Sequence, residues 1–131
     1  MPANHPDIAK SFNNLGMAYS DLGETKKAIE FYEKSLEIQE KCLPANHPDI
    51  AKSYNNLGNA VRALGEFKKA IEFHEKSLEI QKICLPSYHP DIATSYNNLG
   101  FAYRDLGDTK KSLDCFQQAD IISQYNKQNI S

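Results

Sequence analysis

The sequence predicts an all-α solenoid, in which three antiparallel helix pairs form a single domain over residues 1–131. The first observation is a repeat: NNLG occurs at 13–16, 55–58 and 97–100, a step of 42 residues each time. The second is that apolar residues recur at spacings of three and four, as on one face of a helix. Such units bury their apolar surface between neighbours, so no single central core is expected.

The repeat divides the chain into units 1–42, 43–84 and 85–126, with a short tail, 127–131. Met1 stands where the later units begin with leucine, as it would in a piece cut from a longer array. Each unit is expected to hold two helices, named helix A and helix B here.

Helix A of the first unit has a recognisable start and end. Pro6 lacks only an N–H that the first turn does not use, and Asp7 favours the positive end of the helix. Gly23 is placed to take the left-handed conformation that ends a helix, so helix A should end at about Leu22. One apolar face follows the three-four spacing: Ile8, Phe12, Leu15, Gly16, Tyr19 and Leu22.

Helix B is predicted from about Thr25 to Lys41, because this stretch has strong helix formers and no glycine or proline. Its apolar residues spread over more than one side. It must therefore contact both its own helix A and the next unit, which predicts a stack.

Helix A of every unit contains an interior glycine, at Gly16, Gly58 and Gly100. Such a glycine costs roughly 1 kcal/mol relative to alanine. Because it recurs, we expect it to admit a bulky side chain of helix B. The side chains at that position are Tyr32, His74 and Phe116.

The third unit departs from the other two. Units one and two differ at 10 of 42 positions, whereas units two and three differ at 22, of which 16 lie in the last 19 positions. Asp120 stands where the earlier units have leucine, and a carboxylate is costly against a following repeat. The last helix is therefore expected to leave this face in water.

Composition narrows the function classes. A formal net charge of −2 gives no field that would attract nucleic acid or an anionic membrane. No apolar run reaches the roughly 18 residues of a membrane span, and no secretory signal opens the chain. Cys42, Cys84 and Cys115 are odd in number and form no CxxC pair, which is typical of thiols in a reducing compartment. We therefore expect a cytoplasmic protein.

The motif aromatic-x-x-Leu-Gly-x-x-Tyr in helix A (Phe12, Leu15, Gly16, Tyr19), with Ala28 on helix B, resembles the tetratricopeptide repeat, TPR. The usual repeat has 34 residues. The 42-residue form, with HPDIA at its start and NNLG inside it, is similar to the repeats of kinesin light chains. The resemblance implies a right-handed superhelix whose helix A residues line a concave groove that binds an extended peptide of a partner protein.

Two consecutive asparagines in every helix A need an explanation, because asparagine is a mediocre helix former. Their carboxamides both donate and accept, so they could clamp the backbone of an extended ligand. Alternatively, one asparagine of each pair holds neighbouring helices together. Asn14, Asn56 and Asn98 are our choice for the ligand side. The full predicted groove set is Lys10, Asn13, Asn14, Met17, Lys52, Asn55, Asn56, Asn59, Arg62, Asn97, Asn98, Phe101 and Arg104.

The cations in this set favour an acidic or mixed peptide, although they could equally be ordinary solvated surface. Lys10 with Asn14 resembles the clamp that holds the C-terminal carboxylate of chaperone tails in some TPR proteins. Thr94 replaces the lysine in unit three, so that clamp is incomplete. Side-chain selectivity is expected at the position that varies most between units, occupied by Met17, Asn59 and Phe101.

Other functions lack support in the sequence. The tripeptide HPD at His5, His47 and His89 also marks J-domains, but there it occurs once, whereas here it opens every unit. Histidines one repeat apart are too distant to share a metal ion. No arrangement of nucleophile, base or phosphate loop is present, so we predict no catalytic activity, cofactor or metal site. The alternative function is structural: self-association through the uncovered face of the first unit, which includes Ile8 and Phe12.

Overall fold

The computed structural model describes residues 5–129, so the ends of the predicted domain, 1–4 and 130–131, lie outside the described residues. The described part consists of six helices: α1 (Pro6–Asp21), α2 (Thr25–Cys42), α3 (Pro48–Ala63), α4 (Phe67–Cys84), α5 (Pro90–Leu106) and α6 (Thr109–Gln128).

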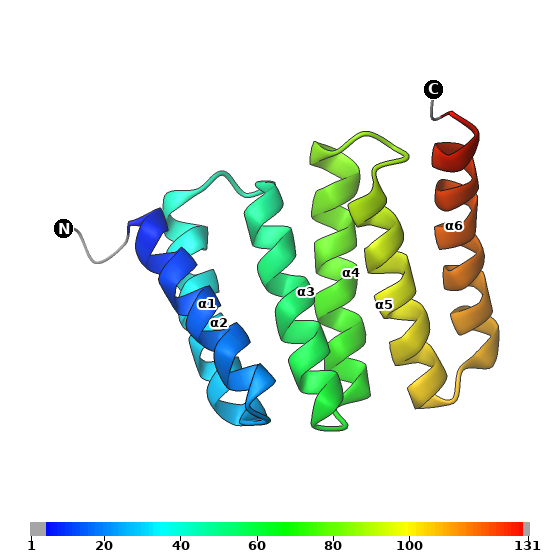
Figure 1. Ribbon diagram of the computed structural model, residues 1–131. Coiled ribbons are helices and arrows are strands. Elements are labelled where there is room, and N and C mark those ends of the chain that lie inside the picture. Colours follow the sequence, from blue (N-terminus) through cyan, green and yellow to red (C-terminus); the bar gives the residue numbers. More distant parts are fainter. Residues whose placement is uncertain (1–4, 130–131) are drawn as a thin grey trace.

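The helices form successive antiparallel pairs laid side by side along the chain (Figure 1). α1 packs on α2, α3 on α4 and α5 on α6, and adjacent pairs meet where α2 contacts α3 and α4 contacts α5. We call these two contacts the first and the second junction. Buried apolar residues gather in two clusters, one around each junction. The predicted all-α superhelical solenoid is confirmed.

The tripeptide HPD is a helix start. In each unit the imidazole Nδ1 of the histidine accepts a hydrogen bond of 3.0 Å from the backbone N–H two residues on, as His47 does from Asp49. The proline then occupies the first helical turn, and the aspartate lies at its positive end. Histidine is thus the N-cap residue, a role that its sequence position alone did not reveal.

The helix ends follow the predicted turn chemistry. Gly23, Gly65 and Gly107 have φ values of 82°, 84° and 95°, the left-handed region that glycine tolerates best. α1 ends at Asp21 and α2 extends to Cys42, each within one residue of the predicted end.

The interior glycines admit a ring from helix B, as predicted. A Cβ built on Gly16 would lie 2.6 Å from Tyr32, one on Gly58 would lie 2.5 Å from His74, and one on Gly100 would lie 2.6 Å from Phe116. A Cβ atom essentially never lies within 3.0 Å of a non-bonded ring atom. The missing side chain therefore sets how closely the two helices of each pair approach.

A buried hydrogen bond recurs at the two junctions. Ser53 Oγ on α3 donates to Gln39 Oε1 on α2 at 2.5 Å, and Ser95 on α5 donates to Gln81 on α4 at the same distance. All four residues are buried. These bonds fix the register of each pair against the next, because a shift by one residue would leave both partners unsatisfied in the interior.

The predicted apolar face of α1 is only partly correct. Leu15 is 43% exposed and Leu22 is 75% exposed, whereas Leu57, the counterpart of Leu15, is 1% exposed. This leucine packs against helix B of the preceding unit, and no such helix precedes α1 in the described residues. At the other end Asp120 is exposed, where its counterpart Leu78 is buried, as expected.

Gly58→Ala should destabilise the protein, by about 1–3 kcal/mol, despite the higher helix propensity of alanine. The new methyl group meets the His74 ring, which is fully buried and bonded to Asn55 and so cannot swing aside. Urea denaturation measures the change. The matched comparison is the same substitution in a His74→Ala background, where the loss should largely disappear. An equal loss in both backgrounds would contradict the proposed contact.

Candidate functional site

A groove of about 350 Å³ runs over the helix A side of the stack. We call it the central groove. It is formed by α1, α3 and α5, with one residue from α4. Its lining residues are Asn13, Met17, Lys52, Asn55, Asn56, Asn59, Gln81, Asp91, Thr94 and Asn98. A smaller hollow of about 260 Å³ shares Met17, Asn56 and Asn59 with it and lies towards the C-terminal end of α1.

The structure brings together part of the predicted set. Seven of the thirteen predicted residues line the central groove: Asn13, Met17, Lys52, Asn55, Asn56, Asn59 and Asn98. Lys10, Asn14 and Asn97 are exposed but do not line it. Arg62, Phe101 and Arg104 lie together outside the central groove. The groove residues that sequence reasoning left out of the set are Gln81, Asp91 and Thr94.

Asn55 holds the stack together. Its Nδ2 donates to Ser95 Oγ at 3.0 Å, and its Oδ1 lies 2.8 Å from His74 Nδ1. Since Ser95 also donates to Gln81, a continuous chain of hydrogen bonds runs from the core of the second pair to the second junction. This is the alternative role considered for one asparagine of each pair, and it removes Asn55 as a candidate for ligand contact.

Asn56, chosen for the ligand side, lines the groove but is already partly engaged. Asn56 Nδ2 donates to Asn13 Oδ1 at 3.1 Å, so these two carboxamides already bond to each other across α1 and α3. Asn59 and Asn98 line the groove and form no hydrogen bond among residues 5–129. The donors and acceptors most available to a ligand are therefore on Asn59 and Asn98, with Asn14 pointing outside the groove.

Arg62 does not supply unpaired charge. Its Nε lies 2.5 Å from Asp105 Oδ2, a contact between units two and three, and its guanidinium lies 5.4 Å from the centre of the Phe101 ring. Arg104 stacks on the same ring at 5.0 Å. Phe101 thus contacts two guanidinium groups and Phe116, whose ring centre lies 5.1 Å away, while 36% of Phe101 stays exposed. This cluster connects α3 of the second unit with α5 and α6 of the third unit.

The charge inside the central groove is mixed. Lys52 and Asp91 both line it, and neither belongs to an ion pair with another unit in the described part of the chain. The Asp91 carboxylate faces its own N-cap histidine, His89, at 3.9 Å. The predicted preference for an acidic ligand therefore rests on Lys52 alone within the groove.

His74 is a buried imidazole with no exposed surface, beneath Gly58 and bonded to Asn55 through Nδ1. Burial, and secondarily the positive charge of Arg62, lowers its pKa to about 4. With Nδ1 donating to Asn55, Nε2 carries a lone pair that has no hydrogen-bond partner in the part of the chain that the structure describes. His74 is therefore a neutral core residue.

The described residues show neither a cluster of three or more His, Cys, Asp or Glu side chains suited to a metal ion nor a helix long and apolar enough to cross a membrane.

The fold and the groove define a class: a solenoid of helix pairs whose A helices form a polar, amide-lined surface. Two overlapping stretches, residues 7–83 and 49–119, match the tetratricopeptide repeat family. The chain belongs to this family, which is a family of protein–protein interaction modules, and its 42-residue repeats are of the kinesin-light-chain kind.

Solved structures of relatives agree with this assignment. A Podosopora anserina protein described as a kinesin light chain with nearly identical TPR-like repeats is 30% identical, with a TM-score of 0.81, over 99% of this chain and 61% of that one. BtubC (BKLC) from P. vanneervenii is 24% identical with a TM-score of 0.90, over 98% of this chain and 51% of that one, and so shows the fold alone. The chain spans about half to three fifths of these structures.

A curated relative matches a shorter stretch. Heat shock protein STI1 of Saccharomyces cerevisiae is 53% identical over 36 residues, which make up 28% of this chain and 6% of that protein. The matched stretch is thus shorter than one 42-residue unit.

The burial of His74 predicts a pH dependence of stability. Since the folded pKa is lowered from 6.5 to about 4, the unfolded chain binds the proton first as the pH falls. His74 therefore costs no stability above about pH 6.5, and between pH 6.5 and 4 it removes about 3 kcal/mol. Chemical denaturation at several pH values measures this loss.

The comparison variant is His74→Phe, which introduces the residue type that unit three has at this position. The variant should lose less stability than the wild type between pH 6.5 and 4, whatever its absolute stability. Parallel curves for the two proteins would contradict the assignment of a buried, neutral His74.

Proposed function

We propose that the protein is an interaction scaffold that binds an extended peptide segment of a partner protein in the central groove. The observation that supports it best is that Asn59 and Asn98, on neighbouring A helices, line the groove with carboxamides that the stack does not use. A carboxamide both donates and accepts, so it matches the N–H and C=O groups that an extended peptide leaves unpaired.

The chemistry of the lining indicates what the peptide carries. Amide groups predominate, Lys52 offers one cation and Asp91 one anion, and Met17 offers an adaptable apolar contact that is 50% exposed. These groups suit a polar peptide with an acidic residue near Lys52 and one apolar side chain near Met17. Because a short ligand must be ordered on binding, we expect affinity on the order of micromolar. The cytoplasmic location stays a prediction from the cysteines.

Self-association by end-to-end stacking is less well supported than peptide binding. It would bring Asp120 to the place that Leu36 and Leu78 occupy at the junctions, and Ser123 to the place of Gln39 and Gln81. The end formed by α6 thus lacks both the apolar contact and the glutamine acceptor. Equilibrium sedimentation at several concentrations tests this, and we expect a monomer.

The binding proposal predicts that Asn59→Ala combined with Asn98→Ala weakens capture of peptides by at least about tenfold. A peptide array of acidic, neutral and basic ten-residue sequences identifies ligands, and fluorescence anisotropy measures the affinity of the best one. The free energy of unfolding should change by less than about 0.5 kcal/mol, since neither carboxamide forms a hydrogen bond with residues 5–129.

The matched control is Asn55→Ala, the same substitution at a residue that bonds within the stack. It should cost about 1–3 kcal/mol of stability, because it leaves buried partners unsatisfied. Unchanged peptide affinity in the Asn59 and Asn98 double variant would refute the groove proposal.

A further inference from the structure

A second cavity, of about 450 Å³, lies beside the first junction and is lined by residues of α2, α3 and α4. We call it the α2–α4 pocket. Its lining residues are Glu33, Leu36, Glu37, Glu40, Lys41, Leu57 and Phe73. None of them lines the central groove. The pocket therefore belongs to a separate surface, formed chiefly by the B helices.

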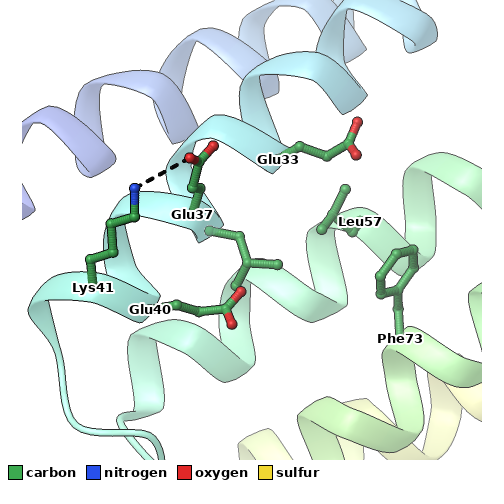
Figure 2. A pocket seen from close by; sticks show the side chains of 7 residues that line it. Glu33, Glu37, Glu40, Lys41, Leu57 and Phe73 are labelled. Atoms are coloured by element: carbon green, nitrogen blue, oxygen red, sulfur yellow. Dashed lines mark hydrogen bonds and ion pairs between the residues drawn. The ribbon is translucent and has the colours of Figure 1, made fainter. Parts of the chain in front are cut away.

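The floor of the α2–α4 pocket is apolar. Leu36 and Leu57 are buried side chains from α2 and α3, and Phe73 is a half-buried ring from α4. In Figure 2 Leu57 and Phe73 lie across the pocket from the side chains of α2. A cavity of this size with an apolar floor can accept one large apolar side chain.

The rim on α2 is acidic. Glu33, Glu37 and Glu40 follow the three-four spacing of one helix face, and Figure 2 shows all three projecting from the same helix at the pocket. Lys41 Nζ lies 3.4 Å from Glu37 Oε1 and neutralises that carboxylate. Glu33 and Glu40 form no ion pair or hydrogen bond within residues 5–129. Two uncompensated negative charges thus flank the apolar floor.

The second junction lacks this arrangement. There the counterpart of Glu33 is Glu75, whose Oε1 accepts a hydrogen bond of 2.9 Å from the Tyr103 hydroxyl group. At the first junction the residue equivalent to Tyr103 is Val61, which has no hydroxyl group, so Glu33 remains available.

Two more differences remove the remaining features of the pocket from the second junction. Cys115 takes the place of Phe73, and Lys82 takes the place of Glu40. Of the two junctions in the described part of the chain, the first therefore has both the aromatic floor and the unpaired acidic rim, and the second has neither.

We propose that the α2–α4 pocket docks a basic amphipathic segment of a partner protein, which inserts one large apolar side chain between lysine or arginine residues. The apolar side chain lies on Leu57 and Phe73, and the flanking cations face Glu33 and Glu40. Charge complementarity of this kind favours basic partners and disfavours acidic ones. The protein would then have two independent docking surfaces, one on each side of the stack.

A display library of random 12-residue peptides, selected on the whole chain, tests this. Selected clones are then titrated against three variants. The pocket variant is Glu33→Gln with Glu40→Gln, and the charge-matched control is Glu30→Gln with Glu72→Gln, two exposed glutamates that do not line the pocket. The third is the groove variant, Asn59→Ala with Asn98→Ala.

We expect a group of clones that bind the pocket variant about tenfold more weakly and bind the other two variants as they bind the wild type. Their sequences should carry lysine or arginine within four residues of Leu, Ile, Phe, Tyr or Trp. Absence of any clone with this dependence, or dependent clones without cations, would overturn the proposal. Clones sensitive only to the groove variant test the peptide groove and leave this result independent of it.

Discussion

The architecture depends on how closely helix A approaches helix B. In each pair a glycine faces a ring across the interface, and a single methyl group on that glycine would overlap with the ring. Because the two helices are close, Asn55 on helix A lies within hydrogen-bond distance of His74 on helix B. Without this approach the hydrogen bonds that connect one pair to the next would lack their geometry. The energetic penalty of a glycine inside a helix is offset by packing that no larger residue permits.

The three rings against these glycines are not equivalent. Tyr32 and Phe116 occupy the equivalent positions as a phenol ring and a phenyl ring. His74 differs from both because its ring nitrogen forms a hydrogen bond with Asn55. The middle pair is thereby tied to the third through Asn55 and Ser95. A neutral imidazole is the form that suits this place: burial, and secondarily the charge of Arg62, lowers the pKa of His74, and no described residue is a hydrogen-bond partner of its Nε2. Specific polar contacts in the interior thus distinguish units that share one repeat pattern.

The fold could be predicted well from the sequence because the same helix-start, helix-end and packing signals recur in the repeated units. Three features depend only on residues close in sequence or on one facing helix: the HPD tripeptide that begins each A helix, the glycines in the left-handed conformation, and the role of Gly58. The site was harder to predict. Whether an asparagine serves a ligand or the stack depends on what faces it from another unit, as Ser95 faces Asn55.

The charged residues show the same limit. Asp105 neutralises Arg62 across a separation of 43 residues, which periodicity within one helix does not reveal. Asp91 and Gln81 enter the groove because α4 and the start of α5 lie beside α3, a matter of how neighbouring pairs are placed. The pattern of differences between units was the available signal for Thr94 and for the pocket at Glu33. Its meaning required knowing which side chains share a surface.

The serine and glutamine that bond across the junctions also determine which units can be neighbours through this bond. Unit two carries both halves, Ser53 towards unit one and Gln81 towards unit three, and unit one has the same two residue types at Ser11 and Gln39. A further copy of either unit could therefore form this bond with a unit on each side. Unit three keeps the serine but has Ser123 instead of the glutamine, so a copy placed internally would interrupt the series. Among these three units, the order in which neighbours can be joined by this bond is therefore set by a single glutamine position.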